Sequence, residues 1–219
     1  DHGIESQGPV VFYKLLYEVL ARSFADELGE ADFSVFVSSP LRKRSLPGFA
    51  VNDSSLWWDD VRTQDRVESR EEIVAAAFSA TAEALTAQLG ADTDVWRWGK
   101  VHTLEHKHLV GRQPPLNAWF NVGPFPAPGG EEVINNIGFT LNGEGLYPAT
   151  HGPSRRSVID FADPENSMSI LPTGQSGEVM SPHYGDQAEK YIQGQFRRQL
   201  MNRKEIEAQS PDRLIFTPE

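Results

Sequence analysis

The sequence has 219 residues, of which 39% are hydrophobic and 23% are charged, and its formal net charge is −11. This composition is typical of a globular protein with a sizeable core, and it excludes a disordered chain. The acidic balance argues against a nucleic-acid partner, because phosphate contacts need a basic face. The absence of cysteine excludes disulfides, thiolate metal sites and cysteine nucleophiles.

Targeting and membrane signals are lacking in the sequence. No apolar run approaches the roughly 20 residues of a membrane-spanning helix, so we expect a soluble chain with no membrane partner. The first residues, Asp1 to Glu5, have neither the basic start nor the apolar run of a signal peptide, and they look like a cut end of a longer chain. A cysteine-free chain suits an exported protein, so we expect a periplasmic or secreted location.

Two helices are predicted in the first half. Gly8-Pro9 suits the start of the first, apolar residues then recur at three- and four-residue steps, and Gly29 suits its end. The second begins at Ser69, which has Glu72 three residues later in the spacing of a capping box, and it ends at Gly90.

The segments between these helices are shorter. Residues 33–37 predict a short strand or a buried helical turn, and residues 40–47, with prolines at both ends, predict a loop. Trp57-Trp58 is expected on a short helical turn that packs against the body of the protein.

After Val95, glycine, proline and asparagine become dense and helical periodicity is lost. Short apolar runs follow at residues 133–134, 137–141, 157–161 and 167–171. These runs predict an antiparallel sheet. A helix is expected over residues 184–207 and a closing strand over 212–217. The expected fold is α+β, a single unit over 1–219 with a mainly helical part (1–93) and a strand-rich part (94–219).

His102, His106 and His108 lie close together in the sequence. On a helix, His102 and His106 would share one face, as a zinc site requires. The pattern here is His-Thr-Leu-Glu-His, in which the glutamate adjoins the second histidine, and the flanking glycines and prolines leave no room for a long helix. We therefore favour histidines that hydrogen-bond within a packed irregular segment over a metal site.

Gly174-Gln-Ser-Gly177 resembles a serine-hydrolase elbow but has Glu178 where the elbow needs glycine. We interpret Ser176 as a turn residue whose neighbouring glycines supply positive φ angles. His183 and Asp186 follow closely, but three polar residues in one loop do not establish a catalytic triad.

Arginines and tryptophans offer weaker signals. We expect Arg155 or Arg156 to pair with one of the 31 acidic residues, for example Asp160 or Asp163, rather than to bind an anion. A basic cluster is interpreted as a solvated helix face; it comprises Arg197, Arg198, Arg203 and Lys204. The tryptophans are assigned to a core or an interface rather than to a ligand groove; they are Trp57, Trp58, Trp96, Trp98 and Trp119.

Four ordered segments together carry a family resemblance. Trp96-Arg-Trp-Gly-Lys-Val-His102 resembles the Trp-x-Trp-Gly-x-x-His segment of penicillin acylase large subunits, and Gly152-Pro-Ser-Arg-Arg156, with Asp160 following, resembles their Gly-Pro-Ser-x-Arg-x-x-x-Asp segment. Leu171 to Gly177 is similar to their Pro-Gly-Gly-Gln-Ser-Gly segment, and Ser181 to Gln187 to their Ser-x-His-Tyr and Asp-Gln run. The likeness covers residues 94–217 well and the helical first half in general character.

The resemblance implies the carboxy-terminal part of the large (beta) subunit of an N-terminal-nucleophile hydrolase, a four-layer αββα sandwich. In that family a precursor cleaves itself and exposes an N-terminal serine, whose α-amine is the base for amide hydrolysis. Asp1 cannot play that part, so no catalytic residue is carried over. We therefore expect no catalytic, cofactor-binding or metal-binding residue in this chain. Asn121 and Asn135-Asn136 are interpreted as turn or strand residues.

The resemblance also implies partners and a substrate class. The partners are the amino-terminal remainder of the large subunit and the small (alpha) subunit, and the substrate is a small N-acyl compound of the penicillin type. Structural calcium in the complete enzyme would be bound upstream of this chain. This chain alone is expected to be inactive and to expose a large apolar surface. The alternatives are an N-acyl-homoserine-lactone acylase of the same fold and a stand-alone, non-enzymatic ligand-binding module.

Overall fold

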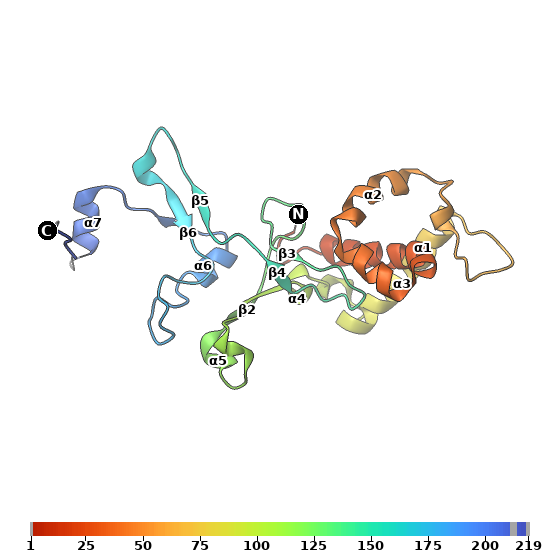
Figure 1. Ribbon diagram of the computed structural model, residues 1–219, viewed down its shortest axis with the longest axis horizontal. Coiled ribbons are helices and arrows are strands. Elements are labelled where there is room, and N and C mark those ends of the chain that lie inside the picture. The colour runs from red at the N-terminus through yellow and green to blue at the C-terminus, as the bar shows by residue number, and fades with distance from the viewer. Residues whose placement is uncertain (1, 211–213, 218–219) are drawn as a thin grey trace. The chain divides into compact units, whose positions relative to one another are not determined.

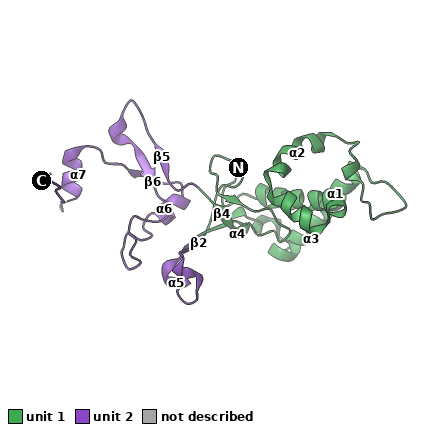
Figure 2. Cartoon of the chain, in the orientation of Figure 1, with its two compact units in different colours: residues 1–105, 124–152 green, residues 106–123, 153–219 purple. Residues whose placement is uncertain are grey.

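The computed structural model describes residues 2–210 and 214–217 and divides the chain into two compact units. Unit 1 comprises residues 1–105 and 124–152, and unit 2 comprises residues 106–123 and 153–219 (Figure 2). These two units do not coincide with the mainly helical part (1–93) and the strand-rich part (94–219) of the sequence. The reason is packing: residues that follow the helices, such as Trp98 and Phe139, join the aromatic core that the first helix begins.

Helix α1 (Gly8–Ser38) starts as predicted, with Pro9 in its first turn. Gly29, at φ 72°, kinks the helix where an end was expected, and the chain continues as helix. Residues 33–37 therefore form the helical alternative, with Phe33 and Val37 buried. Helix α1 thus consists of two helical pieces that are joined at a glycine in the left-handed region.

The loop expected over residues 40–47 is wrong, because helix α2 (Pro40–Val51) occupies this segment. Ser39 caps it by accepting a hydrogen bond from the Leu41 N–H, and Pro40 lies in the first turn, where a proline is tolerated. Arg42 anchors the helix through the Val37 carbonyl and the Glu131 carboxylate.

The rest of the helical part follows the prediction. A 3-10 turn, η1 (Leu56–Trp58), carries the paired tryptophans. Helix α3 (Arg70–Leu89) begins with the full Ser69–Glu72 capping box and ends at Gly90, whose φ is 99°. Helix α3 packs along α1 (Figure 1), and its apolar stripe is buried there.

Short elements make up residues 93–151. In unit 1 they are η2 (Thr93–Val95), α4 (Trp98–Val101), β3 (Gly138–Phe139) and β4 (Ala149–His151), and in unit 2 they are η3 (Val110–Arg112) and α5 (Asn117–Phe120). Strands β1 (Thr103–His106) and β2 (Val122–Pro126) each have residues in both units. Strands β1 and β2 form one two-stranded sheet, and β3 and β4 form an antiparallel pair with a register shift between Gly138 and Phe139. The apolar run 133–134 is not a strand.

Aromatic side chains form the centre of unit 1. Trp98 is fully buried, and its indole N–H donates to the Gly129 carbonyl at 2.8 Å. Its ring stacks on Tyr13 at 5.4 Å and lies 5.5 Å from Phe139 and 5.6 Å from Tyr147. Side chains from residues as far apart as 13 and 147 thus pack around one indole. This aromatic packing stabilises unit 1 although it contains few regular strands.

Unit 2 contains a three-stranded antiparallel sheet in the order β5-β6-β7. Besides η3 and α5, its elements are β5 (Arg156–Val158), η4 (Pro164–Asn166), β6 (Met168–Ile170), α6 (Ala188–Ile192), β7 (Arg197–Arg198) and α7 (Arg203–Gln209). Helices with small antiparallel sheets confirm the α+β fold class.

The long helix expected over residues 184–207 is wrong. Helix α6 ends before Gly194, which adopts a positive φ of 69°. Arg197 and Arg198 then pair with β6 as strand β7, so the basic cluster is not one helix face. Of the expected closing strand, residues 214–217 form no strand, and residues 212–213 lie outside the described residues.

Helices of membrane-spanning length and hydropathy do not occur in the described part of the chain.

Candidate functional site

His102 lies in the core of unit 1, where it caps the end of α4 and stacks on Trp98 at 4.7 Å. Its Nδ1 lies 2.6 Å from the Tyr147 carbonyl oxygen. Because a carbonyl can only accept, Nδ1 donates, and the neutral ring leaves a lone pair on Nε2, which has no partner among the described residues. Burial lowers the pKa of His102. This histidine is a packed core residue, as the surrounding sequence predicted.

His106 and His108 belong to unit 2 and do different things. Burial lowers the pKa of His106, whose ring lies 6.5 Å from that of Tyr191. The His108 ring stacks on Phe120 at 5.1 Å, and its Nδ1 accepts from the Val110 N–H. Within residues 2–210 and 214–217, no three histidine or acidic side chains are grouped to hold a metal ion.

The Ser176 loop is a structured turn. The Ser176 hydroxyl accepts from the Glu178 N–H at 3.1 Å, and its backbone N–H donates to the His183 carbonyl. The expected positive φ angles at Gly174 and Gly177 are wrong. Gly174 is needed instead for close approach, because a Cβ there would collide with the His183 carbonyl oxygen.

His183 and Asp186 do meet, with Nδ1 3.1 Å from Oδ2, but the Ser176 hydroxyl hydrogen bond goes to the backbone. A nucleophile–base–acid relay is therefore not formed by these three residues. Ser176 instead shares a pocket of about 230 Å³ with His106, His108 and other side chains of unit 2.

The two arginines after Gly152 differ in burial and partners. Arg155 donates to the Gln199 side-chain oxygen at 2.9 Å, so the predicted pairing with Asp160 or Asp163 is wrong for this residue. Arg156 lies over the Tyr191 ring, with its guanidinium carbon 3.7 Å from the ring centroid, and donates to the Tyr191 carbonyl at 2.6 Å. Tyr191 in turn donates to the Pro153 carbonyl, which closes this cluster.

The tryptophans are mostly core residues. Trp58, Trp96 and Trp98 are buried in unit 1, and Trp57 is partly exposed beside Phe24. Trp119, in unit 2, is 67% exposed. An exposed aromatic row, as a carbohydrate-binding or peptide-binding module would present, is not found among the described tryptophans.

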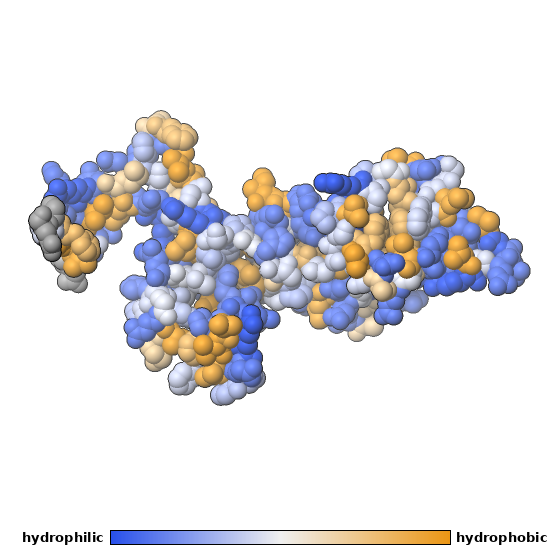
Figure 3. Space-filling model, viewed as in Figure 1, coloured by the Kyte–Doolittle hydropathy of each residue, from blue (hydrophilic) through white to orange (hydrophobic). Residues whose placement is uncertain are grey.

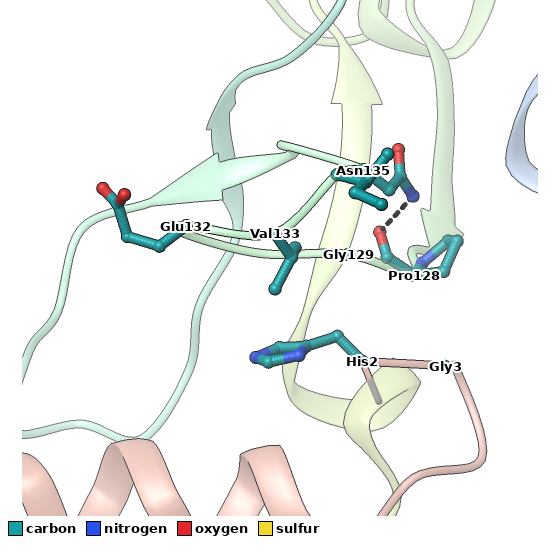
Figure 4. Close-up of a pocket in the computed structure, with 8 residues that line it drawn as sticks. His2, Gly3, Pro128, Gly129, Glu132, Val133 and Asn135 are labelled. Carbon is teal, nitrogen blue, oxygen red and sulfur yellow. Dashed lines mark hydrogen bonds between the residues drawn. The ribbon is translucent and has the colours of Figure 1, made fainter.

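Unit 1 contains a pocket of about 490 Å³, and Figure 4 shows its lining. One wall is the segment His2-Gly3, and the other is the loop from Pro128 to Asn135. The walls are joined by the backbone, since the Gly129 N–H donates to the His2 carbonyl at 2.7 Å. The Asn135 carboxamide donates to the Pro128 carbonyl at 3.2 Å, the dashed line in Figure 4.

Glycine makes the tight loop of this pocket possible. Gly129 has a φ of 90°, and a Cβ there would collide with the Asn135 carbonyl. Two ion pairs hold the loop on α2, Arg42–Glu131 at 2.7 Å and Lys43–Glu132 at 2.6 Å. Lys43 lowers the pKa of Glu132 through a hydrogen bond.

The chemistry that this pocket offers is binding. His2 places its imidazole toward the loop (Figure 4), its Nε2 is 3.1 Å from the Tyr13 hydroxyl, and burial lowers its pKa. The lining contains no serine, threonine or lysine, so its residues supply a neutral ring, an amide, a carboxylate that is paired with Lys43 and two apolar side chains, and no hydroxyl or amine nucleophile. Neither His2 nor Asn135 is marked as a site residue by the sequence; the one available signal is the Gly129-Gly130 pair, which marks a tight turn.

Known proteins match this chain over most of its length. The penicillin amidase family matches residues 1–208. The acyl-homoserine lactone acylase QuiP of Pseudomonas fluorescens (strain Pf0-1) is 29% identical over 196 residues, which cover 87% of this chain and 23% of the relative. QuiP of Pseudomonas aeruginosa is 26% identical over 208 residues, covering 87% and 24%. The penicillin acylase 2 proenzyme of Pseudomonas sp. (strain SE83) is 34% identical over 96 residues, covering 41% and 12%.

The chain thus spans about a quarter of the length of the QuiP relatives. The family match extends over the helical first half as well as the strand-rich second half, where the sequence motifs lie. The chain belongs to the penicillin amidase family.

Proposed function

We propose that this chain is a structural, carboxy-terminal part of an amidohydrolase that removes the acyl group from N-acyl amides. The observation that carries the proposal is the family match over residues 1–208. The named relatives are acylases, and they share 26% to 34% identity with the matched stretches of this chain.

The nucleophile is proposed to lie outside this chain. In this mechanism, self-cleavage of a precursor exposes a serine whose own α-amine takes the hydroxyl proton, and an acyl-enzyme forms and is hydrolysed. Two features support this: the chain is about a quarter as long as the QuiP relatives, and the lining of the unit 1 pocket contains no serine or threonine hydroxyl. The structural calcium implied by the resemblance has no grouped ligands in the described part of the chain, so no step here depends on it.

Exposed surface supports a partner that is the rest of the polypeptide, namely the amino-terminal part of the large subunit and the small subunit. The chain, of 24.4 kDa, exposes 14060 Å². One folded body of this mass would expose about 10,000 Å², and two separate bodies the size of the two units about 12,000 Å². The excess of about 2,000 Å² on this chain is more than the roughly 800 Å² that each partner buries in a stable protein interface.

Much of that surface is apolar, as expected for a chain that packs against missing parts. Orange patches lie on both units in Figure 3. Strongly exposed side chains include Leu56, Leu109, Trp119, Ile134, Phe161, Met180 and Phe216.

A second candidate is an N-acyl-homoserine-lactone acylase. It is favoured by the coverage of the matches, since QuiP relatives align with 87% of this chain and the penicillin acylase relative with 41%. The stand-alone binding module has less support, because three of the five tryptophans are buried.

The test compares the complete polypeptide with this chain alone. Both are assayed for hydrolysis of a phenylacetyl amide and of an N-acyl homoserine lactone. We expect turnover only by the complete, processed polypeptide, and loss of turnover when its N-terminal serine is replaced by alanine. Turnover by these 219 residues alone, or by neither protein on either substrate, would contradict the proposal. Cell fractionation tests the proposed periplasmic or secreted location.

A further inference from the structure

Unit 2 contains a pocket of about 380 Å³ whose lining is rich in hydrogen-bond donors. It is lined by Arg155, Ser169, Leu171, Gln175, Gln187, Arg197, Arg198 and Gln199. None of these lining residues is acidic, although the chain as a whole has a net charge of −11. A basic pocket on an acidic chain is therefore a local feature and does not follow from composition.

Gln187 is built into the floor of this pocket. Its side chain is 4% exposed, and its side-chain oxygen accepts from the Leu171 N–H at 3.1 Å. Its backbone N–H donates to the Thr173 carbonyl at 2.9 Å, which fixes the residue at both ends. Its side-chain amide nitrogen has no hydrogen-bond partner among the described residues, so this pocket-lining residue keeps a donor that a ligand can use.

The charges around the pocket are unequal. Arg197 lies 3.8 Å from Asp186, and Arg198 lies 3.1 Å from Glu205. Arg155 instead donates to the neutral Gln199 side chain, and the Gln199 backbone is held in place by the Ser167 carbonyl. Three guanidinium groups thus face two carboxylates, and one positive charge is left without a carboxylate.

We propose that this pocket binds a carboxylate between Arg155 and the Gln187 amide. A carboxylate carries one negative charge and two acceptor oxygens, which fit one guanidinium fork and one further N–H donor. A phosphate dianion would add a second charge next to Asp186 and Glu205 and be repelled by them. The carboxylate comes either from a free organic acid or from an aspartate or glutamate elsewhere in the acylase polypeptide.

The experiment titrates sodium acetate at pH 8 into the complete acylase polypeptide and into this chain, with arginine Nε NMR signals and calorimetry as readouts. We expect acetate to shift the Arg155 signal and to bind more tightly than inorganic phosphate. Arg155→Gln should weaken acetate binding about tenfold or more. The matched control is Arg203→Gln, an exposed arginine of unit 2 whose partner is Glu207, and it should leave binding unchanged.

The two possible sources of the carboxylate, a free organic acid and an acidic side chain of the acylase polypeptide, give different binding results. Binding of acetate to both proteins indicates a free acid. Binding to this chain alone, with an acidic side chain in contact with Arg155 in a crystal structure of the complete polypeptide, indicates an internal carboxylate. The inference is overturned if neither protein binds acetate and Arg155 contacts no carboxylate, if phosphate binds more tightly, or if Arg203→Gln weakens binding as much as Arg155→Gln. None of these readouts depends on amide hydrolysis, so failure of the proposed function would be seen separately.

Discussion

Replacing Tyr147 by phenylalanine should stabilise unit 1. The Tyr147 side chain is 1% exposed, and its hydroxyl has no hydrogen-bond partner among the described residues. Its ring, in contrast, is well packed, with centroids 5.0 Å from Phe139 and 5.6 Å from Trp98. Tyr147→Phe keeps the ring and removes only the unsatisfied oxygen.

The expected gain follows from the desolvation of that hydroxyl. A buried hydroxyl without a partner costs about 1–3 kcal/mol, and the small void that replaces the oxygen offsets part of this. We expect the free energy of unfolding to rise by about 1 kcal/mol, which corresponds to about 2–4 °C in Tm. Burial raises the pKa of Tyr147 well above its ordinary value, so the gain should be the same at pH 7 and pH 9.

Urea unfolding followed by tryptophan fluorescence is a suitable assay, because four of the five tryptophans belong to unit 1. Tyr13→Phe is the matched control. The Tyr13 hydroxyl contacts His2 Nε2 at 3.1 Å, so its removal should lower the free energy of unfolding by about 1 kcal/mol. If Tyr147→Phe is destabilising by a similar amount, the hydroxyl has a partner and the argument is refuted.

Three further predictions concern single residues. The pKa of His102 is lowered in the folded state, so below the unfolded value of about 6.5 the unfolded chain binds a proton that the folded chain does not. The free energy of unfolding should therefore fall by about 1.4 kcal/mol per pH unit below that value, and His102→Gln should reduce this pH dependence in urea unfolding between pH 7 and pH 5. Ser69→Ala removes the capping box of α3 and should lower the free energy of unfolding by about 1 kcal/mol, whereas Ser79→Ala on the same helix should not; equal effects would contradict the capping argument. Gly129→Ala should cost more than about 2 kcal/mol and expose the pocket loop to proteolysis, because the new Cβ meets the Asn135 carbonyl at a positive φ.

Signals that act within one helical turn were readable in the sequence. The Ser69–Glu72 capping box, the proline in the first turn of α1 and the glycine at 90 all have the predicted effect, and Gly29 marks a kink where an end was expected. Each depends on hydrogen bonds or backbone angles that involve residues no more than four positions apart. The family resemblance was likewise readable, because it rests on the order and spacing of short motifs.

Tertiary structure alone decided the features that join distant segments. The expected helix over residues 184–207 is interrupted because Arg197 and Arg198 gain strand partners in β6. His102 is hydrogen-bonded to Tyr147, which is 45 positions away, and Gln187 is hydrogen-bonded to Leu171, which is 16 positions away. Local propensity cannot foresee such contacts, since their free energy depends on which faces meet after the chain has folded and on which polar groups are then left without water.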